Sequence, residues 1–187
     1  MKKYMIGLLV TNKYGVLTRI ASLFARRGYN IDTLTVGETV NPQVSRMTIM
    51  ITGNDHDRDQ MIKQLRKLHD VHFVKEMVAE KSVCRELVLL KVATDRSNRQ
   101  EIIDAANVFR NKIIDYSTDA ITMELTGETK KLDAFIELMK EYGILELGRT
   151  GVVSLKRGAV CYRPLFCARR AKKDGYCRGK RGITDSV

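Results

Sequence analysis

Apolar positions in the first part of the chain change their spacing at short polar breaks. An apolar run at Tyr4–Val10 is rich in strand-forming residues and stops at the polar turn of residues 11–15. Apolar side chains then recur at helical spacing, at Val16, Leu17, Ile20, Leu23 and Phe24. This change of period predicts a strand that enters an amphipathic helix through a tight loop. Two arginines and a glycine at residues 26–28 are typical of a helix end.

The rest of the first half continues the pattern with two strands, a helix and a strand. A second strand is predicted over Ile31–Gly37 and a third, with alternating apolar side chains, over residues 47–52. Apolar positions within residues 61–68 predict a second amphipathic helix, and residues 71–77 predict a fourth strand. The order β-α-β-β-α-β is that of the ferredoxin-like fold, in which two helices cover one face of a four-stranded antiparallel sheet.

A similar order of elements returns after a polar break at residues 79–82. Strands are predicted at 87–93, from 113 and at 121–125, helices near 102–109 and 132–139, and one or two strands within 144–155. The two halves share little residue identity, so the repeat is one of architecture. We therefore predict an α+β protein with two ferredoxin-like (βαββαβ) domains in tandem, at residues 1–80 and 81–160.

Gly15 stands at the predicted start of the first helix. A glycine lets the backbone lie close to whatever the loop faces, and the first helical turn presents unpaired N–H groups at the positive end of the helix dipole. This geometry predicts an anion site. Asn12 and Asn30 are predicted at the same end of the unit, as polar groups that donate and accept hydrogen bonds. The alternative is that Gly15 only makes the turn and the asparagines only cap it, since one glycine is a weak signal.

The same segment resembles a known family. The likeness is carried by Asn12-Lys13-Tyr14-Gly15, by residues 23–36 (LFARRGYNIDTLTV) and by Ser45-Arg46-Met47-Thr48-Ile49, and it extends to Arg157-Gly158. These residues are similar to the ACT domain of the small, regulatory subunit of acetolactate synthase (acetohydroxyacid synthase). The resemblance implies a non-catalytic chain that activates a separate catalytic subunit and confers feedback inhibition by valine in branched-chain amino acid biosynthesis. Thiamine diphosphate, Mg and FAD are expected on that catalytic subunit, and no cofactor on this chain.

The resemblance also implies an effector site between two chains. ACT domains would pair in a homodimer, and valine would bind in the crease between them at Asn12, Gly15, Val16, Leu17, Asn30 and Ile31. The valine carboxylate would meet the N–H groups near Gly15, and Asn12 would bind polar atoms of the amino acid. Asn30 and Ile31 of the facing chain would close the site. The polar loop at residues 95–99 lacks an equivalent glycine, so no second copy of this pocket is expected.

A free-standing amino-acid sensor with no enzyme partner is the alternative function, and binding to a catalytic chain separates the two. An enzyme is not indicated, because no nucleophile with a base at recognisable spacing and no cofactor fingerprint is present. The predicted third strand lacks the aromatic residues on which RNA bases stack. The four cysteines and three histidines fit no metal-ligand spacing, and Cys84 is expected to be a small core or sheet residue.

Charge adds information mainly about the C-terminal end. The net charge is +11 over 187 residues, yet residues 161–187 hold eight of the 33 basic and two of the 22 acidic residues. Basicity is thus mainly a property of this tail, and no nucleic-acid function is indicated. Members of the family usually stop soon after the Arg-Gly at 157–158. The atypical basic tail therefore suggests a frameshifted or read-through end, or a disordered extension.

Two further expectations concern location and the last strands. No apolar stretch approaches the ~20 residues of a membrane span, and no cleavage site follows the first apolar run, which predicts a soluble, cytoplasmic chain.

Arg149 and Arg157 could contact a partner or a nucleotide. Because arginine beside glycine at a strand end is usually exposed, solvated flanks are the favoured interpretation.

Overall fold

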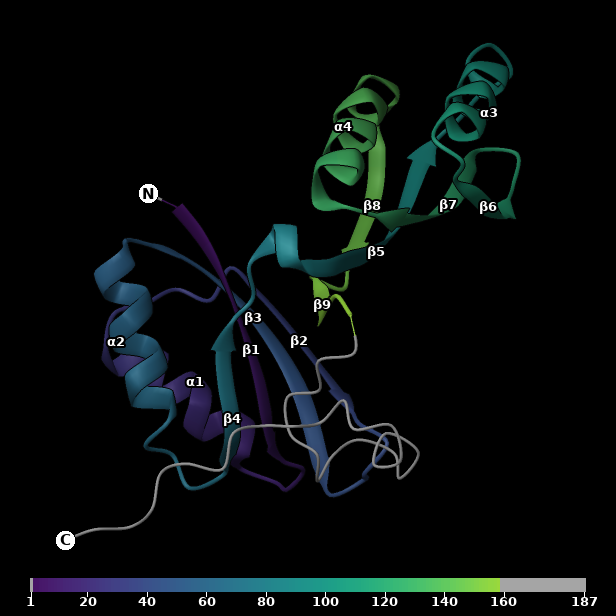
Figure 1. Cartoon of the computed structure of the whole chain (residues 1–187). Helices are drawn as coiled ribbons and strands as arrows, with labels where there is room; N and C mark the ends of the chain where they lie inside the picture. Colours follow the sequence, from purple (N-terminus) through teal and green to yellow (C-terminus); the bar gives the residue numbers. More distant parts are fainter. Residues whose placement is uncertain (1, 159–187) are drawn as a thin grey trace, which may run out of the picture. The chain divides into compact units, whose positions relative to one another are not determined.

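The computed structural model describes residues 2–158 (Figure 1). The chain divides into two compact units. The first contains the residues up to Asp32, Val36–Ser82 and the segment that begins at Leu155, and the second contains Thr33–Thr35 and Val83–Ser154. The predictions for the tail at 161–187 lie outside the described residues.

The first sheet has the strand order β2-β3-β1-β4. Its strands are β1 (Lys2–Thr11), β2 (Thr33–Glu38), β3 (Val44–Gly53) and β4 (Val71–Glu76). The central strand β1 pairs antiparallel with β3, from Lys2 opposite Gly53 to Thr11 opposite Val44, and pairs antiparallel with β4 on its other side. The helices α1 (Val16–Arg26) and α2 (Asp55–Leu65) cover one face of this sheet (Figure 1).

Helix α1 forms where the apolar spacing predicts, whereas α2 begins at Asp55, before the predicted apolar positions at 61–68, and ends at Leu65. The apolar sides of both helices make the core of the first unit. Helix α2 begins with a capping box, in which Asn54 and Asp57 satisfy each other's backbone N–H groups. The core side chains of α1, α2 and β3 that are at most 1% exposed are Ile20, Phe24, Met61, Leu65, Ile49 and Ile51. Burial of each such side chain contributes about 1.5–3 kcal/mol, so packing rather than helix propensity stabilises these helices.

The second unit repeats this architecture with one additional strand. Its sheet has the order β6-β7-β5-β8, and β9 also pairs with β5. The elements are β5 (Ser82–Ala93), α3 (Arg99–Val108), β6 (Lys112–Tyr116), β7 (Ala120–Gly127), α4 (Thr129–Met139), η2 (Lys140–Tyr142), β8 (Ile144–Arg149) and β9 (Val153–Lys156). The short helix η1 (Ala79–Lys81) precedes them and belongs to the first unit. Phe109 and Phe135 meet in its core with ring centroids 5.0 Å apart. The predicted fold class is confirmed, and the segment 144–155 supplies two strands.

The second strand starts later than predicted, at Thr33 instead of Ile31. Gly28, at φ 71°, and a hydrogen bond of 3.1 Å from the Tyr29 N–H to the Phe24 carbonyl close the end of α1 and keep the next residues beside it. The Tyr29 hydroxyl is then held by Asp57 Oδ1 (3.1 Å) and Gln60 Oε1 (3.0 Å) of α2. Residues 29–32 are therefore a loop.

The prediction that Asn12 and Asn30 share one end of the unit is wrong within a single chain. The Asn12 N–H donates to the Gln43 carbonyl (2.8 Å), just before β3, whereas the Asp32 N–H donates to the Met50 carbonyl (2.9 Å). At ~3.3 Å per residue along β3, these positions are roughly 20 Å apart. The physical reason is that α1 carries the chain back along the sheet before Asn30 is reached.

Candidate functional site

The start of α1 presents backbone N–H groups that no side chain of residues 2–158 caps. Gly15 is the N-cap residue, with φ 78° and ψ −12°, in the left-handed region that costs glycine no steric strain. The first turn of α1 contains no acidic residue. The positive end of the helix dipole is therefore not neutralised by the helix's own side chains, and it is a favourable place for an anion.

A guanidinium group lies beside this helix start. Arg19 follows Gly15 by one helical turn, and its Nη2 atom is 3.7 Å from the position that a Cβ would take at Gly15. Arg19 Nη1 forms an ion pair of 2.6 Å with Asp70 Oδ2, and the Arg19 side chain is 61% exposed. A cation in the first turns of a helix is unfavourable for the helix itself. An anion bound here would meet both the N–H groups and Arg19.

Asn12 is fixed in the turn that leads to this helix. Its Nδ2 donates to Glu38 Oε1 (2.9 Å) and to the Pro42 carbonyl (2.8 Å). These bonds use both N–H donors of the amide and tie Asn12 to the end of β2. The acceptor Oδ1 is then the Asn12 atom suited to a ligand that donates a proton, such as an ammonium group.

The other predicted site residues fall into two groups. The Val16 side chain is 2% exposed and packs into the core, so Val16 can contribute only its backbone, whereas Leu17 is 43% exposed beside it. Asn30, whose Nδ2 donates to Asp32 Oδ1 (3.1 Å), and the half-buried Ile31 precede the other end of β2. Within one chain, residues 12–17 therefore lie together at the start of α1, and residues 30–31 lie at the opposite end of the sheet.

Sequence reasoning missed Arg19, Asp70 and Glu38 at this site. The spacing of four residues between Gly15 and Arg19 was a usable signal, because residues i and i+4 share a helix face. Asp70 is distant in sequence and reaches the site because its carbonyl accepts a hydrogen bond of 2.9 Å from the Thr11 N–H. Glu38 arrives with the far end of β2. Only the fold brings these two carboxylates to the turn.

The corresponding loop of the second unit holds a carboxylate of its own. Asp95 Oδ1 accepts hydrogen bonds from the Ser97 N–H (2.7 Å) and the Asn98 N–H (3.0 Å), directly before α3. Its hydrogen bond from the Ser97 hydroxyl, followed by these N–H groups, lowers the pKa of Asp95. An external anion would meet this carboxylate, so the loop is poorly suited to bind one.

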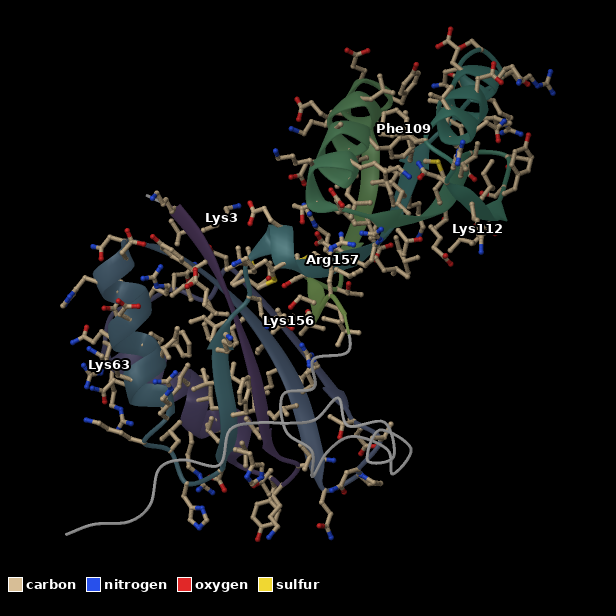
Figure 2. All side chains as sticks on the ribbon, viewed as in Figure 1. Lys3, Lys63, Phe109, Lys112, Lys156 and Arg157 are labelled. Atoms are coloured by element: carbon tan, nitrogen blue, oxygen red, sulfur yellow. The ribbon has the colours of Figure 1, made fainter. Side chains whose placement is uncertain are left out.

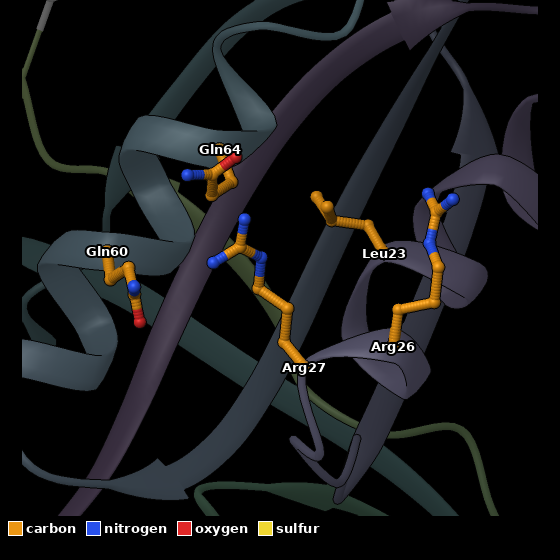
Figure 3. A pocket seen from close by; sticks show the side chains of 5 residues that line it. All are labelled: Leu23, Arg26, Arg27, Gln60 and Gln64. Carbon is orange, nitrogen blue, oxygen red and sulfur yellow. The ribbon is translucent and has the colours of Figure 1, made fainter.

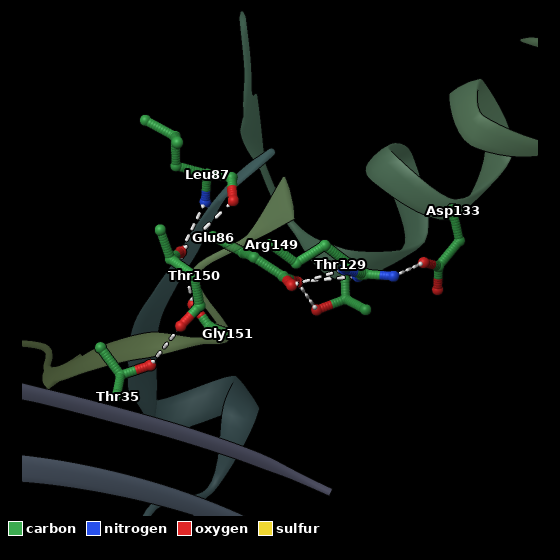
Figure 4. A network of polar contacts seen from close by, with 8 residues as sticks. All are labelled: Thr35, Glu86, Leu87, Thr129, Asp133, Arg149, Thr150 and Gly151. Atoms are coloured by element: carbon green, nitrogen blue, oxygen red, sulfur yellow. Dashed lines mark hydrogen bonds and ion pairs between the residues drawn. The ribbon is translucent and has the colours of Figure 1, made fainter. Parts of the chain in front are cut away.

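Arg149 is not the solvated flank that was expected. Its guanidinium forms an ion pair with the buried Glu86 (2.8 Å from Nε to Oε1), whose side chain is 2% exposed, and with Asp133 (2.9 Å) of α4 (Figure 4). The hydrogen bonds that Arg149 donates to Glu86, and then to Asp133, raise its pKa against the effect of desolvation. Thr129 also donates to Glu86 Oε2 (3.2 Å). The network joins β5, β8 and α4, while Arg157 is exposed.

Both halves of the chain match family models of known proteins. Residues 6–73 match the family model for the AHAS small subunit-like ACT domain, and residues 85–158 match the model for the small subunit of acetolactate synthase. The chain belongs to the acetolactate synthase small-subunit family. The family resemblance found in the sequence is thereby confirmed, and the chain is similar to small subunits of that enzyme.

Curated members of the family match over nearly their whole length. The probable acetolactate synthase small subunit of Methanothermobacter thermautotrophicus is 48% identical over 157 residues, which is 83% of this chain and 94% of the relative. The acetolactate synthase small subunit of Mycolicibacterium smegmatis is 46% identical over 153 residues, covering 82% and 90% of the two chains. The crystal structure of the acetolactate synthase small subunit from Thermotoga maritima has a TM-score of 0.79 and 41% identity, covering 86% of this chain and 100% of that one.

Residues 2–158 contain neither a cluster of metal-ligating side chains nor a helix that could span a membrane. No group of three or more potential metal-ligating side chains lies together in this part of the chain. No helix among the same residues is both long and apolar enough to cross a membrane.

Proposed function

We propose that this chain activates the catalytic subunit of acetolactate synthase and makes it sensitive to valine. The start of α1 is the observation that carries the proposal. An α-amino acid has a carboxylate, which suits the uncapped N–H groups at Gly15 and the guanidinium of Arg19. It also has an ammonium group, which suits the Oδ1 atom of Asn12 in the same turn. Leu17 offers an exposed apolar surface for the isopropyl group.

A homodimer explains how Asn30 and Ile31 reach the same ligand. Strand β2 is an edge strand of the first sheet, Asn12 is hydrogen-bonded to Glu38 at its end, and residues 30–31 precede its start. A two-fold axis beside β2 would set two β2 strands antiparallel. The start of one strand would then lie near the end of the other, and residues 30–31 of one chain would face Asn12 of its partner. Each ligand would contact both chains.

Such a shared site links effector binding to the geometry of the dimer. Valine can shift the activity of a bound catalytic subunit only if it binds two arrangements of the dimer with different affinity. A coupling free energy of ~1–3 kcal/mol is enough for useful inhibition.

The active site, with its thiamine diphosphate, Mg and FAD, would then lie on the catalytic chain, in the cytoplasm. Within this chain, the boundary between the ACT domain and the C-terminal domain would lie near residue 80. The family matches at 6–73 and 85–158 support this boundary.

The test is calorimetric titration of valine into the full chain and into Gly15→Asp. The new carboxylate would lie at the anion site and repel the carboxylate of valine, so we expect saturable binding to the unmodified chain and at least 100-fold weaker binding to the variant. In assays with the catalytic subunit, Gly15→Asp should retain activation and lose inhibition by valine.

Gly143→Asp is the matched control. Gly143 also has a positive φ (88°), lies in the second unit, and a Cβ added there would make only an ordinary contact of 3.9 Å with the Cβ of Ala93. Both variants place a carboxylate at a glycine of positive φ, so Gly143→Asp should bind valine as the unmodified chain does. A Gly15→Asp variant that remains fully valine-sensitive would show that the site lies elsewhere.

A further inference from the structure

A second feature of the first unit lies on the outer side of its helix layer. An open hollow of about 540 Å³ between α1 and α2 is lined by Leu23, Arg26, Arg27, Gln60 and Gln64. Arg27 points from the end of α1 toward α2, where Gln60 and Gln64 border the same hollow (Figure 3). Apart from Leu23, every lining side chain is a hydrogen-bond donor, and two of them are cationic.

The two arginines of this hollow and three further basic residues on or just after α2 have no ion-pair partner within residues 2–158. Arg26, Arg27, Lys63, Arg66 and Lys67 are exposed, and none of them forms an ion pair with another residue of the described segment 2–158. Figure 2 shows Lys63 on the outer side of α2. Helix α1 contains no acidic residue to offset them. The uncompensated charge on this face is therefore positive.

The carboxylates of α2 are already committed to other contacts. Asp55 and Asp59 form ion pairs with Arg58 at 3.0 and 2.9 Å. Asp57 accepts the Asn54 N–H at the helix start and the Tyr29 hydroxyl. None of these groups is available to neutralise the hollow without breaking an existing contact. An external anion is the remaining partner for the two arginines.

Size and charge narrow down what can occupy the hollow. It is much larger than one inorganic anion, and its openness suits a chain segment that lies across it. A second copy packed symmetrically, face to face, would bring one positive face against another, which is electrostatically unfavourable. Complementary charge therefore favours a partner segment that carries several acidic side chains.

We propose that this face, defined by Arg26, Arg27, Gln60 and Gln64, docks an acidic segment of the catalytic subunit of acetolactate synthase. The inference rests on the proposed function only in naming that partner. Arg26 and Arg27 bind its carboxylates through charge-assisted hydrogen bonds, the two glutamines donate further bonds, and Leu23 supplies the apolar floor. The face lies on the helix layer, so a dimer formed along the edge strand β2 leaves it accessible.

The experiment measures the affinity of the purified catalytic subunit for the full chain and for the double variant Arg26→Glu/Arg27→Glu, at 50 and 300 mM NaCl. We expect the double variant to bind at least tenfold more weakly at low salt and to lose most of the salt dependence, because rim charges act through screened attraction. A second variant, Arg26→Gln/Arg27→Gln, removes the charge without placing a carboxylate at the C-terminal end of α1, and it should show a smaller loss in the same direction.

The matched control is Arg96→Glu/Lys112→Glu, which changes net charge by the same amount at two exposed positions of the second unit. It should bind the catalytic subunit as the unmodified chain does. Equal loss in the control, or no loss in either arginine variant, overturns the proposal. The proposal is also overturned if the arginine variants lose affinity for a DNA or RNA oligonucleotide but bind the catalytic subunit as the unmodified chain does. Titration of each variant with valine separates the docking face from the proposed valine site. A variant that binds valine normally but has lost affinity for the catalytic subunit supports the docking face, whether or not valine controls activity.

Discussion

The two units of this chain begin with the same strand, turn and helix, yet the two helix starts have opposite electrostatic character. At α1 a glycine replaces any capping side chain, no carboxylate lies in the first turn, and Arg19 stands beside the N–H groups. At α3 the carboxylate of Asp95 lies in the turn and accepts two backbone N–H groups. One start is suited to an external anion, and the other already holds its own.

This difference separates fold from function. Both units have the βαββαβ order and similar cores, so the backbone architecture does not decide which turn binds a ligand. A few side chains decide it, namely those that neutralise the helix dipole or leave it open. In the second unit the buried charge of Glu86 has a structural role instead, because its ion pair with Arg149 joins β5 to β8.

The largest expected effect tests whether the second unit is stabilised independently of the α1 site. Glu86→Ala leaves Arg149 without its buried partner, and we expect a loss of about 3 kcal/mol in the free energy of unfolding. Chemical denaturation measures this loss. Valine affinity should be unchanged under conditions where the variant is folded, and its disappearance there would show that the two units are not independent.

Glu146→Ala is the control for this prediction. Its ion pair with Lys91 is exposed, with side chains 73% and 40% accessible, and pairs of that kind contribute about 0–1 kcal/mol. A loss as large as that of Glu86→Ala would mean that burial of the pair is not what matters.

A middle-sized effect tests the role of Arg19 at the open helix start. Arg19→Gln removes a charged partner of the ligand carboxylate, so we expect valine affinity to fall roughly tenfold, or about 1.4 kcal/mol. Isothermal titration measures it. Arg96→Gln, at the turn before α3, makes the same change at the start that holds Asp95 and should leave valine affinity unaltered. Equal affinity in Arg19→Gln would remove Arg19 from the site.

The smallest effect concerns the carboxylate that occupies the second helix start. Because the pKa of Asp95 is lower in the folded chain than its ordinary value, its contribution to stability is present at neutral pH and is lost as pH falls through the folded-state pKa. Asp95→Asn should therefore lower the unfolding midpoint at pH 7, and the difference from the unmodified chain should shrink as the pH falls below the ordinary Asp pKa of about 3.9. A difference that is constant with pH would point to a cause other than charge.

Local patterns were sufficient for most of the fold. Apolar spacing located α1 and α2, and the turn residues located the break at Gly15, because both depend on neighbours within a few positions. The start of β2 was misplaced, since Tyr29 is held at the end of α1 by its N–H bond to Phe24 and by the bond of its hydroxyl to Asp57 of α2. Those contacts join residues that are far apart in sequence.

The site was only partly predictable for the same reason. Asn12 and Gly15 lie in one turn and could be named from their spacing. Asn30 could be named from the family resemblance, but its position at the other end of the sheet follows from the length and direction of α1. Arg149 was misjudged because its partner Glu86 is 63 residues away on the adjacent strand.

The amino-acid sequence by itself determined the order of elements, the family and the glycine that opens the first helix, because these depend on local spacing and residue type. The tertiary structure alone decided which charges meet: Arg19 with Asp70, Asn12 with Glu38, and Glu86 with Arg149. Electrostatic contacts depend on distances in space, and strand pairing sets those distances between residues that are remote along the chain. The open start of α1 is therefore visible in the sequence, while the charges around it are visible only in the fold.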